Sequence, residues 1–151
     1  MESKSELLKD FYRTEIALFR ELLECISMER QNLINMEVKN LWSVMEHKNK
    51  ILKSIEESRQ NFDNIIDSEN PYAGVLTEEK ETISNLKRTL MRLREQISTM
   101  VKENVSFINE TLLFFNDMVS IFTSPNSSNT AYGTSQKNRK KAPNLIYQNE
   151  V

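Results

Sequence analysis

One stretch decides the fold: residues 83–122 read ISNLKRTLMRLREQISTMVKENVSFINETLLFFNDMVSIF. Apolar side chains return along it at alternating steps of three and four, which keeps them on one face of an α-helix. Ten of the twelve positions on this stripe are apolar. The stripe consists of Ile83, Leu86, Leu90, Leu93, Ile97, Met100, Asn104, Phe107, Thr111, Phe114, Met118 and Ile121. The pattern predicts a helix over about residues 78–122, some 67 Å long.

Two shorter stripes precede this helix. The first predicts a helix over about residues 4–33, and the second predicts a helix over about residues 36–66. The first stripe is Tyr12, Ile16, Phe19, Leu23, Ile26, Arg30 and Leu33; the second is Val38, Leu41, Met45, Lys48, Leu52, Ile55, Arg59, Phe62 and Ile66. Folding both helices back along the long one buries all three stripes. We therefore expect an all-α fold, an elongated antiparallel three-helix coiled-coil bundle.

The connections between the helices are short. Between the first two, the stripe changes phase near Asn35, which is a candidate N-cap for the second helix. A kinked, continuous helix is the alternative, but some 63 residues of helix would reach about 95 Å, longer than the third helix could cover. A tight turn is therefore favoured. Before the long helix, residues 67–76 contain Pro71 and Gly74 and predict a loop.

The composition excludes several classes of protein. The chain of 151 residues has two glycines and three prolines, where average usage gives roughly ten and seven, so strand-rich folds with many turns are excluded. The net charge of −2 excludes a globally basic nucleic-acid binder. A lone Cys25 suits a reducing compartment. Because no signal peptide and no uninterrupted apolar run of membrane-spanning length is present, we expect a cytoplasmic protein without stable membrane insertion.

The residues after the long helix differ from the body. They are rich in Ser, Thr, Asn and Pro and carry a basic cluster, Lys137 to Lys141. With so few apolar residues, ordering this segment has little to offset its entropy. We expect a helical body over residues 1–122 and a flexible basic tail over residues 123–151. The basic cluster alone supports only weak, salt-sensitive binding of nucleic acid.

Candidates for chemistry are few. His47 is the only histidine and Cys25 the only cysteine, so zinc and di-iron sites lack ligands, and no glycine-rich phosphate loop is present. We expect no catalytic, metal-binding or cofactor-binding residues and no cofactor. Lys48 and Arg59 fall on the stripe of the second helix, where they either extend to solvent or pair with a glutamate of the first helix. Asn104 is a candidate for fixing the register of the bundle.

The C-terminal half of the long helix has a second apolar stripe. It consists of Val101, Val105, Ile108, Leu112, Phe115, Val119 and Phe122. A helix that is apolar around most of its circumference must be covered on more than one side. Either the first two helices each cover one stripe, or the surface stays open for the amphipathic helix of a partner. The candidate residues for partner binding are Val105, Ile108, Leu112, Phe115, Val119 and Phe122.

Three local patterns, in this order, resemble the FlgN family of flagellar export chaperones. Lys48-x-x-Ile51-Leu52-x-x-Ile55 is similar to the family's Lys-x-x-Leu-Leu-x-x-Leu segment. Asn104, Ile108, Leu112 and Phe115 resemble its Asn followed by spaced leucines and an aromatic residue. Ala131-Tyr132-Gly133 resembles its Tyr-Gly element after the last helix. Where the family often has a Gly-Asp turn, this chain has Asn35-Met36-Glu37.

The resemblance implies a function without cofactor or nucleotide. The third helix and the tail would bind the amphipathic C-terminal helix of hook-filament junction proteins, and so prevent premature assembly in the cytoplasm. The chaperone would then deliver its client to the flagellar export gate, with Tyr132 as a candidate contact. The alternative function is a structural coiled-coil protein that self-associates through the same surface. The residues leave the particular client and the oligomeric state open, including a homo-oligomer.

Overall fold

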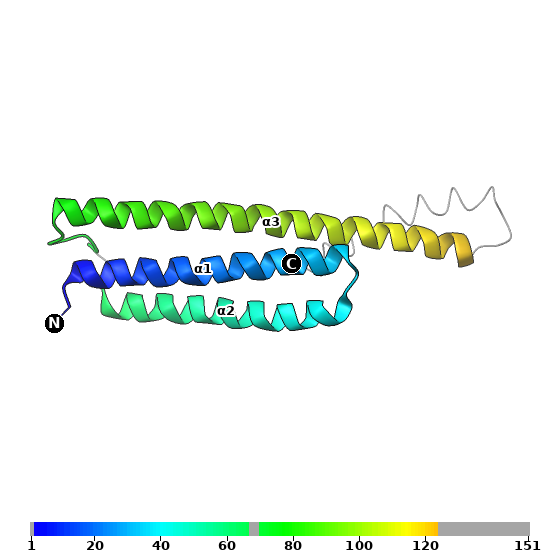
Figure 1. Cartoon of the computed structure of the whole chain (residues 1–151), viewed down its shortest axis with the longest axis horizontal. Helices are drawn as coiled ribbons and strands as arrows, with labels where there is room; N and C mark the ends of the chain where they lie inside the picture. The colour runs from blue at the N-terminus through cyan, green and yellow to red at the C-terminus, as the bar shows by residue number, and fades with distance from the viewer. Residues whose placement is uncertain (1, 67–69, 124–151) are drawn as a thin grey trace. The chain divides into compact units, whose positions relative to one another are not determined.

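The described part of the chain forms three long helices. The computed structural model describes residues 2–66 and 70–123. Its helices are α1 (Lys4–Ile34), α2 (Val38–Ile65) and α3 (Thr77–Thr123), shown in Figure 1. Of the described residues, 89% are helical and none is in a strand, so the predicted all-α class with three helices is confirmed. Of the predicted tail, Thr123 is the last residue of α3, and residues 124–151 lie outside the described residues.

The chain divides into two compact units, Met1–Asn104 and Val105–Val151. The first unit contains α1, α2 and the part of α3 up to Asn104. The second contains the rest of α3. The division into a body and a tail after residue 122, expected above, stays a prediction.

In the first unit, a tight turn joins α1 to α2. The turn is built around Met36, whose φ of 56° lies in the left-handed region. The amide of Glu37 donates to the carbonyl of Asn32 at 2.9 Å, which satisfies one of the last carbonyls of α1. The predicted turn is therefore present, but the predicted N-cap is wrong. Asn35 caps the C-terminus of α1, and Glu37 stands at the N-terminus of α2 without a side-chain cap.

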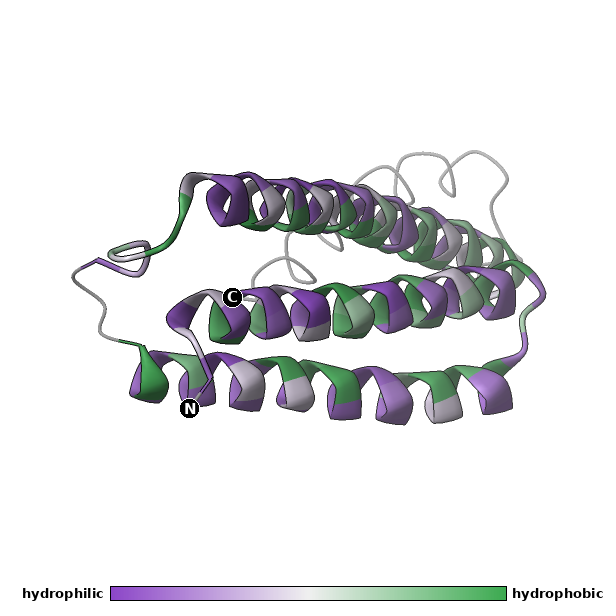
Figure 2. Cartoon of the chain, turned by 60° about the vertical axis from the view of Figure 1, so that its left-hand side comes forward, coloured by the Kyte–Doolittle hydropathy of each residue, from purple (hydrophilic) through white to green (hydrophobic). Residues whose placement is uncertain are grey.

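The core of the first unit draws on all three helices. The larger cluster of buried side chains consists of Ile16, Phe19, Leu22, Cys25, Ile26, Ile51, Ile55, Leu90, Leu93 and Ile97. A smaller cluster near the loop before α3 consists of Leu8, Ile66, Val75 and Ile83. Figure 2 shows hydrophilic and hydrophobic residues alternating along each helix, as this one-sided burial requires.

The buried face of α2 differs from the predicted stripe. Ile51 and Ile55 are the buried residues of α2, whereas Val38, Met45 and Leu52 are exposed. The buried face of α2 therefore lies about 50° around the helix axis from the predicted stripe. The pattern was ambiguous because α2 has apolar residues on two neighbouring faces. Trp42, which is 71% exposed, lies on the uncovered face.

Polar pairs fix the register of α1 against α2. The Arg59 Nε lies 3.3 Å from a carboxylate oxygen of the fully buried Glu15, and the Lys48 Nζ lies 2.7 Å from a carboxylate oxygen of Glu29. Of the two alternatives for these basic residues, pairing with a glutamate of the first helix is the one observed. Because a buried carboxylate without a partner is costly, other registers are disfavoured.

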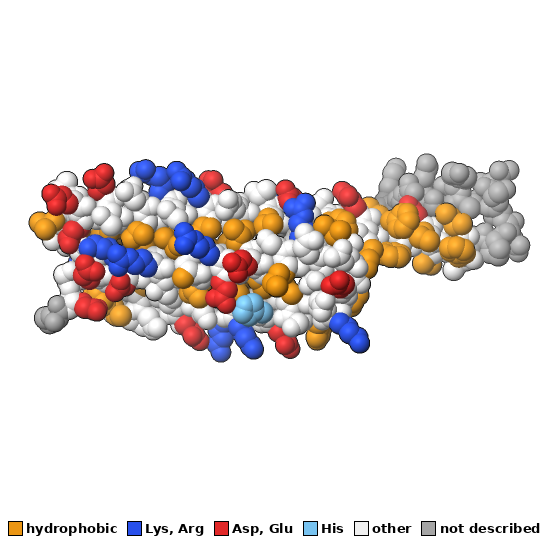
Figure 3. Space-filling model, in the orientation of Figure 1, with side chains coloured by type: hydrophobic (Ala, Val, Ile, Leu, Met, Phe, Trp, Pro, Cys, Tyr) orange, Lys and Arg blue, Asp and Glu red, His pale blue; other side chains and the backbone are white. Residues whose placement is uncertain are grey.

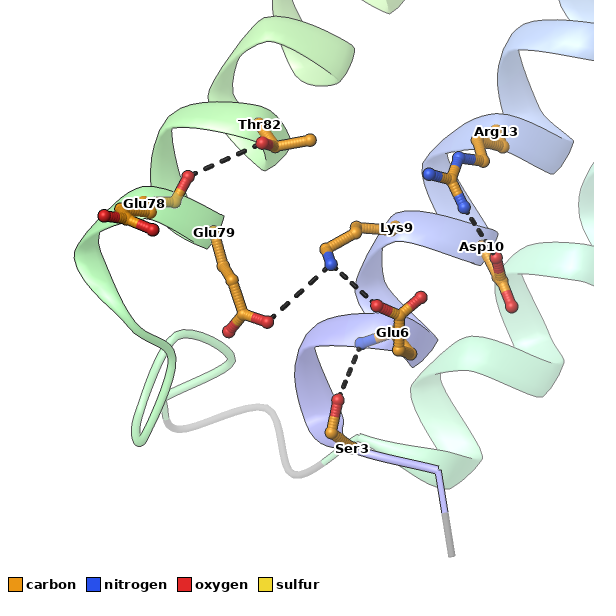
Figure 4. Close-up of polar contacts among 8 residues, drawn as sticks. All are labelled: Ser3, Glu6, Lys9, Asp10, Arg13, Glu78, Glu79 and Thr82. Carbon is orange, nitrogen blue, oxygen red and sulfur yellow. Dashed lines mark hydrogen bonds and ion pairs between the residues drawn. The ribbon is translucent and has the colours of Figure 1, made fainter.

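Polar contacts lie at the N-terminal ends of α1 and α3, and one of them joins the two helices (Figure 4). Ser3 caps α1 by accepting from the amide of Glu6 at 3.2 Å. The Lys9 ammonium lies 2.7 Å from Glu6 and 3.7 Å from Glu79 of α3. The hydrogen bond from Lys9 lowers the pKa of Glu6 and in turn raises the pKa of Lys9.

Candidate partner-binding surface

The exposed apolar surface of α3 begins after Asn104. Asn104 is buried, and its side-chain amide donates to the carbonyl of Ile26 at 3.3 Å. It is the last buried residue of α3, because none of the residues 105–123 is buried. The large apolar side chains exposed there are Val105, Leu112, Phe114, Phe115, Met118, Val119, Ile121 and Phe122. Figure 3 shows the hydrophobic side chains gathered on this part of the helix.

These residues form one wide apolar sector. At about 100° per residue, the apolar side chains of residues 105–122 occupy roughly 200° of the helix circumference. The remaining sector is mostly polar and consists of Ser106, Asn109, Glu110, Leu113, Asn116, Asp117 and Ser120. The helix is therefore strongly amphipathic, with the apolar side the wider one.

Polar groups of this region do not interrupt the apolar sector. Thr111 is the one polar residue within it, and its hydroxyl donates to the carbonyl of Phe107 at 2.8 Å, inside its own helix. The two carboxylates, Glu110 and Asp117, lie seven residues apart on the polar side. A surface of this kind is suited to apolar contact.

The structure brings six of the predicted site residues together. Val105, Ile108, Leu112, Phe115, Val119 and Phe122 occupy one continuous half of the apolar sector. Ile108 is half-buried, and Phe122 at 76% is the most exposed of the six. The seventh, Tyr132, lies outside the described residues. Whether these residues bind a partner stays a prediction.

The other half of the sector corrects an expectation. Phe114, Met118 and Ile121 were assigned to the stripe that packs inside the bundle, yet Phe114 is 61% exposed and all three are solvent-accessible. None of the residues 105–123 is buried, so both stripes are exposed along this segment.

Side chains that could carry chemistry are engaged elsewhere. Cys25 is buried, its thiol lies 3.3 Å from the carbonyl of Val44, and burial raises its pKa, which disfavours the reactive thiolate. His47 lies on the surface, 3.3 Å from Glu21. Among the residues that the structure describes, no group of three or more His, Cys, Asp or Glu could hold a metal ion.

The helix α3 meets the length and composition of a membrane span. It contains an 18-residue window with a mean hydropathy of 1.2, none of which is buried. The window contains Asn and two carboxylates among its apolar residues, so it is not an uninterrupted apolar run. Length and composition alone are weak evidence for a span. Glu110 and Asp117 would be costly at the depth of the hydrocarbon, and their common face makes α3 an amphipathic helix.

The chain is similar to one family along nearly its whole length. A family model described as FlgN protein matches residues 1–140, which include all three helices. No curated protein and no solved structure matches this chain. The order of motifs, the all-α fold and this match agree, and the match covers far more than half of the sequence. The chain therefore belongs to the FlgN family, a family of flagellar export chaperones and not of enzymes.

Proposed function

We propose that this protein is a cytoplasmic flagellar export chaperone that captures the amphipathic C-terminal helix of hook-filament junction proteins on residues 105–123 of α3. The observation that carries the proposal is the exposed apolar sector of that segment. Large apolar patches are rare on proteins that act alone, and they mark surfaces at which partners bind. Masking the client helix prevents its premature assembly.

The chemistry of the surface suits capture and release. Burying one exposed Phe or Leu side chain contributes about 1.5–3 kcal/mol before the costs of association. Several such contacts give a complex that forms without cofactor or nucleotide and that exchanges its client at a competing surface. We place Tyr132 at the contact with the flagellar export gate, the step at which the client is handed over.

The test of the client site compares two exposed positions on the same helix. Phe115 is 47% exposed in the apolar sector, and Met91 is 55% exposed in the first unit. Phe115→Asp and Leu112→Asp are expected to abolish binding of a junction protein's C-terminal segment in calorimetry and in size measurement. Met91→Asp is expected to bind as the unaltered protein does. If all three variants bind the client equally and keep their helicity, the proposed client site on α3 is contradicted.

The contact with the export gate needs a separate experiment. Tyr132→Ala is expected to keep client binding and to lose binding to the cytoplasmic part of the export gate. Removal of residues 124–151 is expected to leave the thermal unfolding of the helices unchanged, because the segment is poor in apolar residues. A tail-free protein that still binds the gate would contradict this assignment.

The second candidate function is self-association as a structural coiled coil. The exposed face of α2, with Val38, Trp42, Met45 and Leu52, favours it because such a stripe can pair with a second copy. Sedimentation over a range of protein concentrations separates the two functions. Stable oligomers that bind no junction protein would support self-association and contradict the chaperone function.

A further inference from the structure

The apolar sector of residues 105–122 is too wide for one partner helix. In the first unit, the buried residues of α3 are Ile83, Leu90, Leu93, Ile97 and Asn104, which occupy only about 80° of the circumference. That narrow sector packs in a core shared with α1 and α2. After Asn104, where no residue is buried, the apolar side chains span about 200°.

The wide sector resolves into two complete seams. Each seam alternates steps of three and four residues, which is the spacing that one packing helix requires. Seam A consists of Val105, Ile108, Leu112, Phe115, Val119 and Phe122. Seam B consists of Phe107, Thr111, Phe114, Met118 and Ile121. Their centres lie about 110° apart on the helix, so one helix lying on seam A leaves seam B exposed.

The two seams differ in their side chains and in their borders. Seam A has aliphatic residues at its outer edge, Val105, Leu112 and Val119, and neutral Asn109 and Asn116 lie beside that edge. Seam B contains Phe107 and Phe114, and Glu110 and Asp117 lie beside its outer edge. A helix that packs on seam B therefore gains from Lys or Arg at its flanking positions, whereas a helix on seam A does not.

We propose that the client occupies residues 105–123 with two helical segments of one molecule, an amphipathic one on seam A and a second one with basic flanks on seam B. This inference rests on the proposed function. Both segments bind along about 28 Å of helix. Linkage within one client makes the second docking step intramolecular, which raises the overall affinity without a new surface.

Cysteine footprinting reads the two seams separately. Leu112 and Phe114 are two residues apart in sequence but lie at opposite edges of the sector, about 160° apart. Single thiols are placed by Leu112→Cys for seam A, Phe114→Cys for seam B and, as a control on the polar side, Ser106→Cys. The background is Cys25→Ser, which keeps a donor for the Val44 carbonyl, or Cys25→Ala should the serine variant unfold.

The probes are a full-length hook-filament junction protein and a synthetic peptide of its C-terminal helix alone. The full-length client is expected to slow maleimide labelling about tenfold or more at positions 112 and 114, since a covered thiol is inaccessible, and to leave position 106 unchanged. The single-helix peptide is expected to protect position 112 only.

The outcomes distinguish this inference from the function on which it rests. Protection of one edge alone by the full-length client overturns the two-segment inference and leaves the chaperone function intact. Protection of neither edge overturns both. Protection of both edges without client that grows with protein concentration assigns the surface to a second copy. Protection without client that requires phosphatidylcholine and phosphatidylglycerol vesicles assigns the surface to a membrane. Either result also overturns the inference.

Discussion

Two isoleucines on the same helix give opposite expectations for stability and for binding. Ile83 is 0% exposed and belongs to the smaller core cluster, whereas Ile121 is 70% exposed on seam B. Ile83→Ala removes three buried carbon groups, which costs about 2.4 kcal/mol in transfer free energy. The cavity left behind adds about 1 kcal/mol, because the neighbouring side chains relax only partly. The expected loss in the free energy of unfolding is therefore about 3–4 kcal/mol.

Ile121→Ala removes the same groups from an exposed position. No buried contact is lost, and alanine is the better helix former by about 0.4 kcal/mol, so stability is expected to stay the same or to rise slightly. Urea unfolding followed by circular dichroism measures both variants, and calorimetry with a junction protein measures binding below the unfolding transition. Ile83→Ala is expected to bind normally and Ile121→Ala to bind weakly. A loss of stability in Ile121→Ala equal to that in Ile83→Ala would refute the reasoning, because Ile121 would then be a core residue.

Three further predictions concern polar and backbone features of the first unit. Arg59→Met leaves the buried Glu15 carboxylate without its partner and is expected to lower the free energy of unfolding in urea by about 2–3 kcal/mol. Adding Glu15→Met is expected to restore most of this loss. Additive losses in the double variant would contradict this pairing. Met36→Gly relieves a left-handed φ of 56° and is expected to raise the free energy of unfolding by about 0.5–1 kcal/mol, whereas a lower unfolding midpoint would place the turn in another conformation. The Lys9 hydrogen bond lowers the pKa of Glu6. This pair therefore stabilises the fold above the ordinary glutamate pKa, and its contribution is lost as the pH falls through the lowered pKa. In NMR, the Glu6 carboxyl resonance should titrate below 4.5, and its pKa should return to the ordinary value in Lys9→Met.

The helices could be read from the sequence because their stripes are long and their interruptions few. The stripe of twelve positions determines where the third helix lies in the sequence. The stretch around Pro71 and Gly74 is the evident loop before it. For Lys48 and Arg59 the sequence leaves two alternatives, extension to solvent or a glutamate partner, and the packing of α1 against α2 decides for the partner.

What the sequence could not give depends on tertiary packing. The face that α2 buries is set by where α1 and α3 lie, and apolar residues on both sides of that face made two rotations compatible with the pattern. The turn between α1 and α2 was expected, but its caps were not, because Met36 has a left-handed φ at a position where glycine is usual. For the candidate surface, periodicity finds both stripes but does not say which elements cover them. The structure leaves both exposed after Asn104.

Hydrogen exchange with and without client tests the central claim most directly, the claim that residues 105–123 of α3 form the client-binding surface. Amides of an uncovered helix end open more readily than those of a packed core, so an added partner should slow their exchange. We expect a hook-filament junction protein to protect residues 105–123 and to leave α2, with its own exposed face at Trp42, unchanged. Protection on α2 without protection of residues 105–123 would contradict the account.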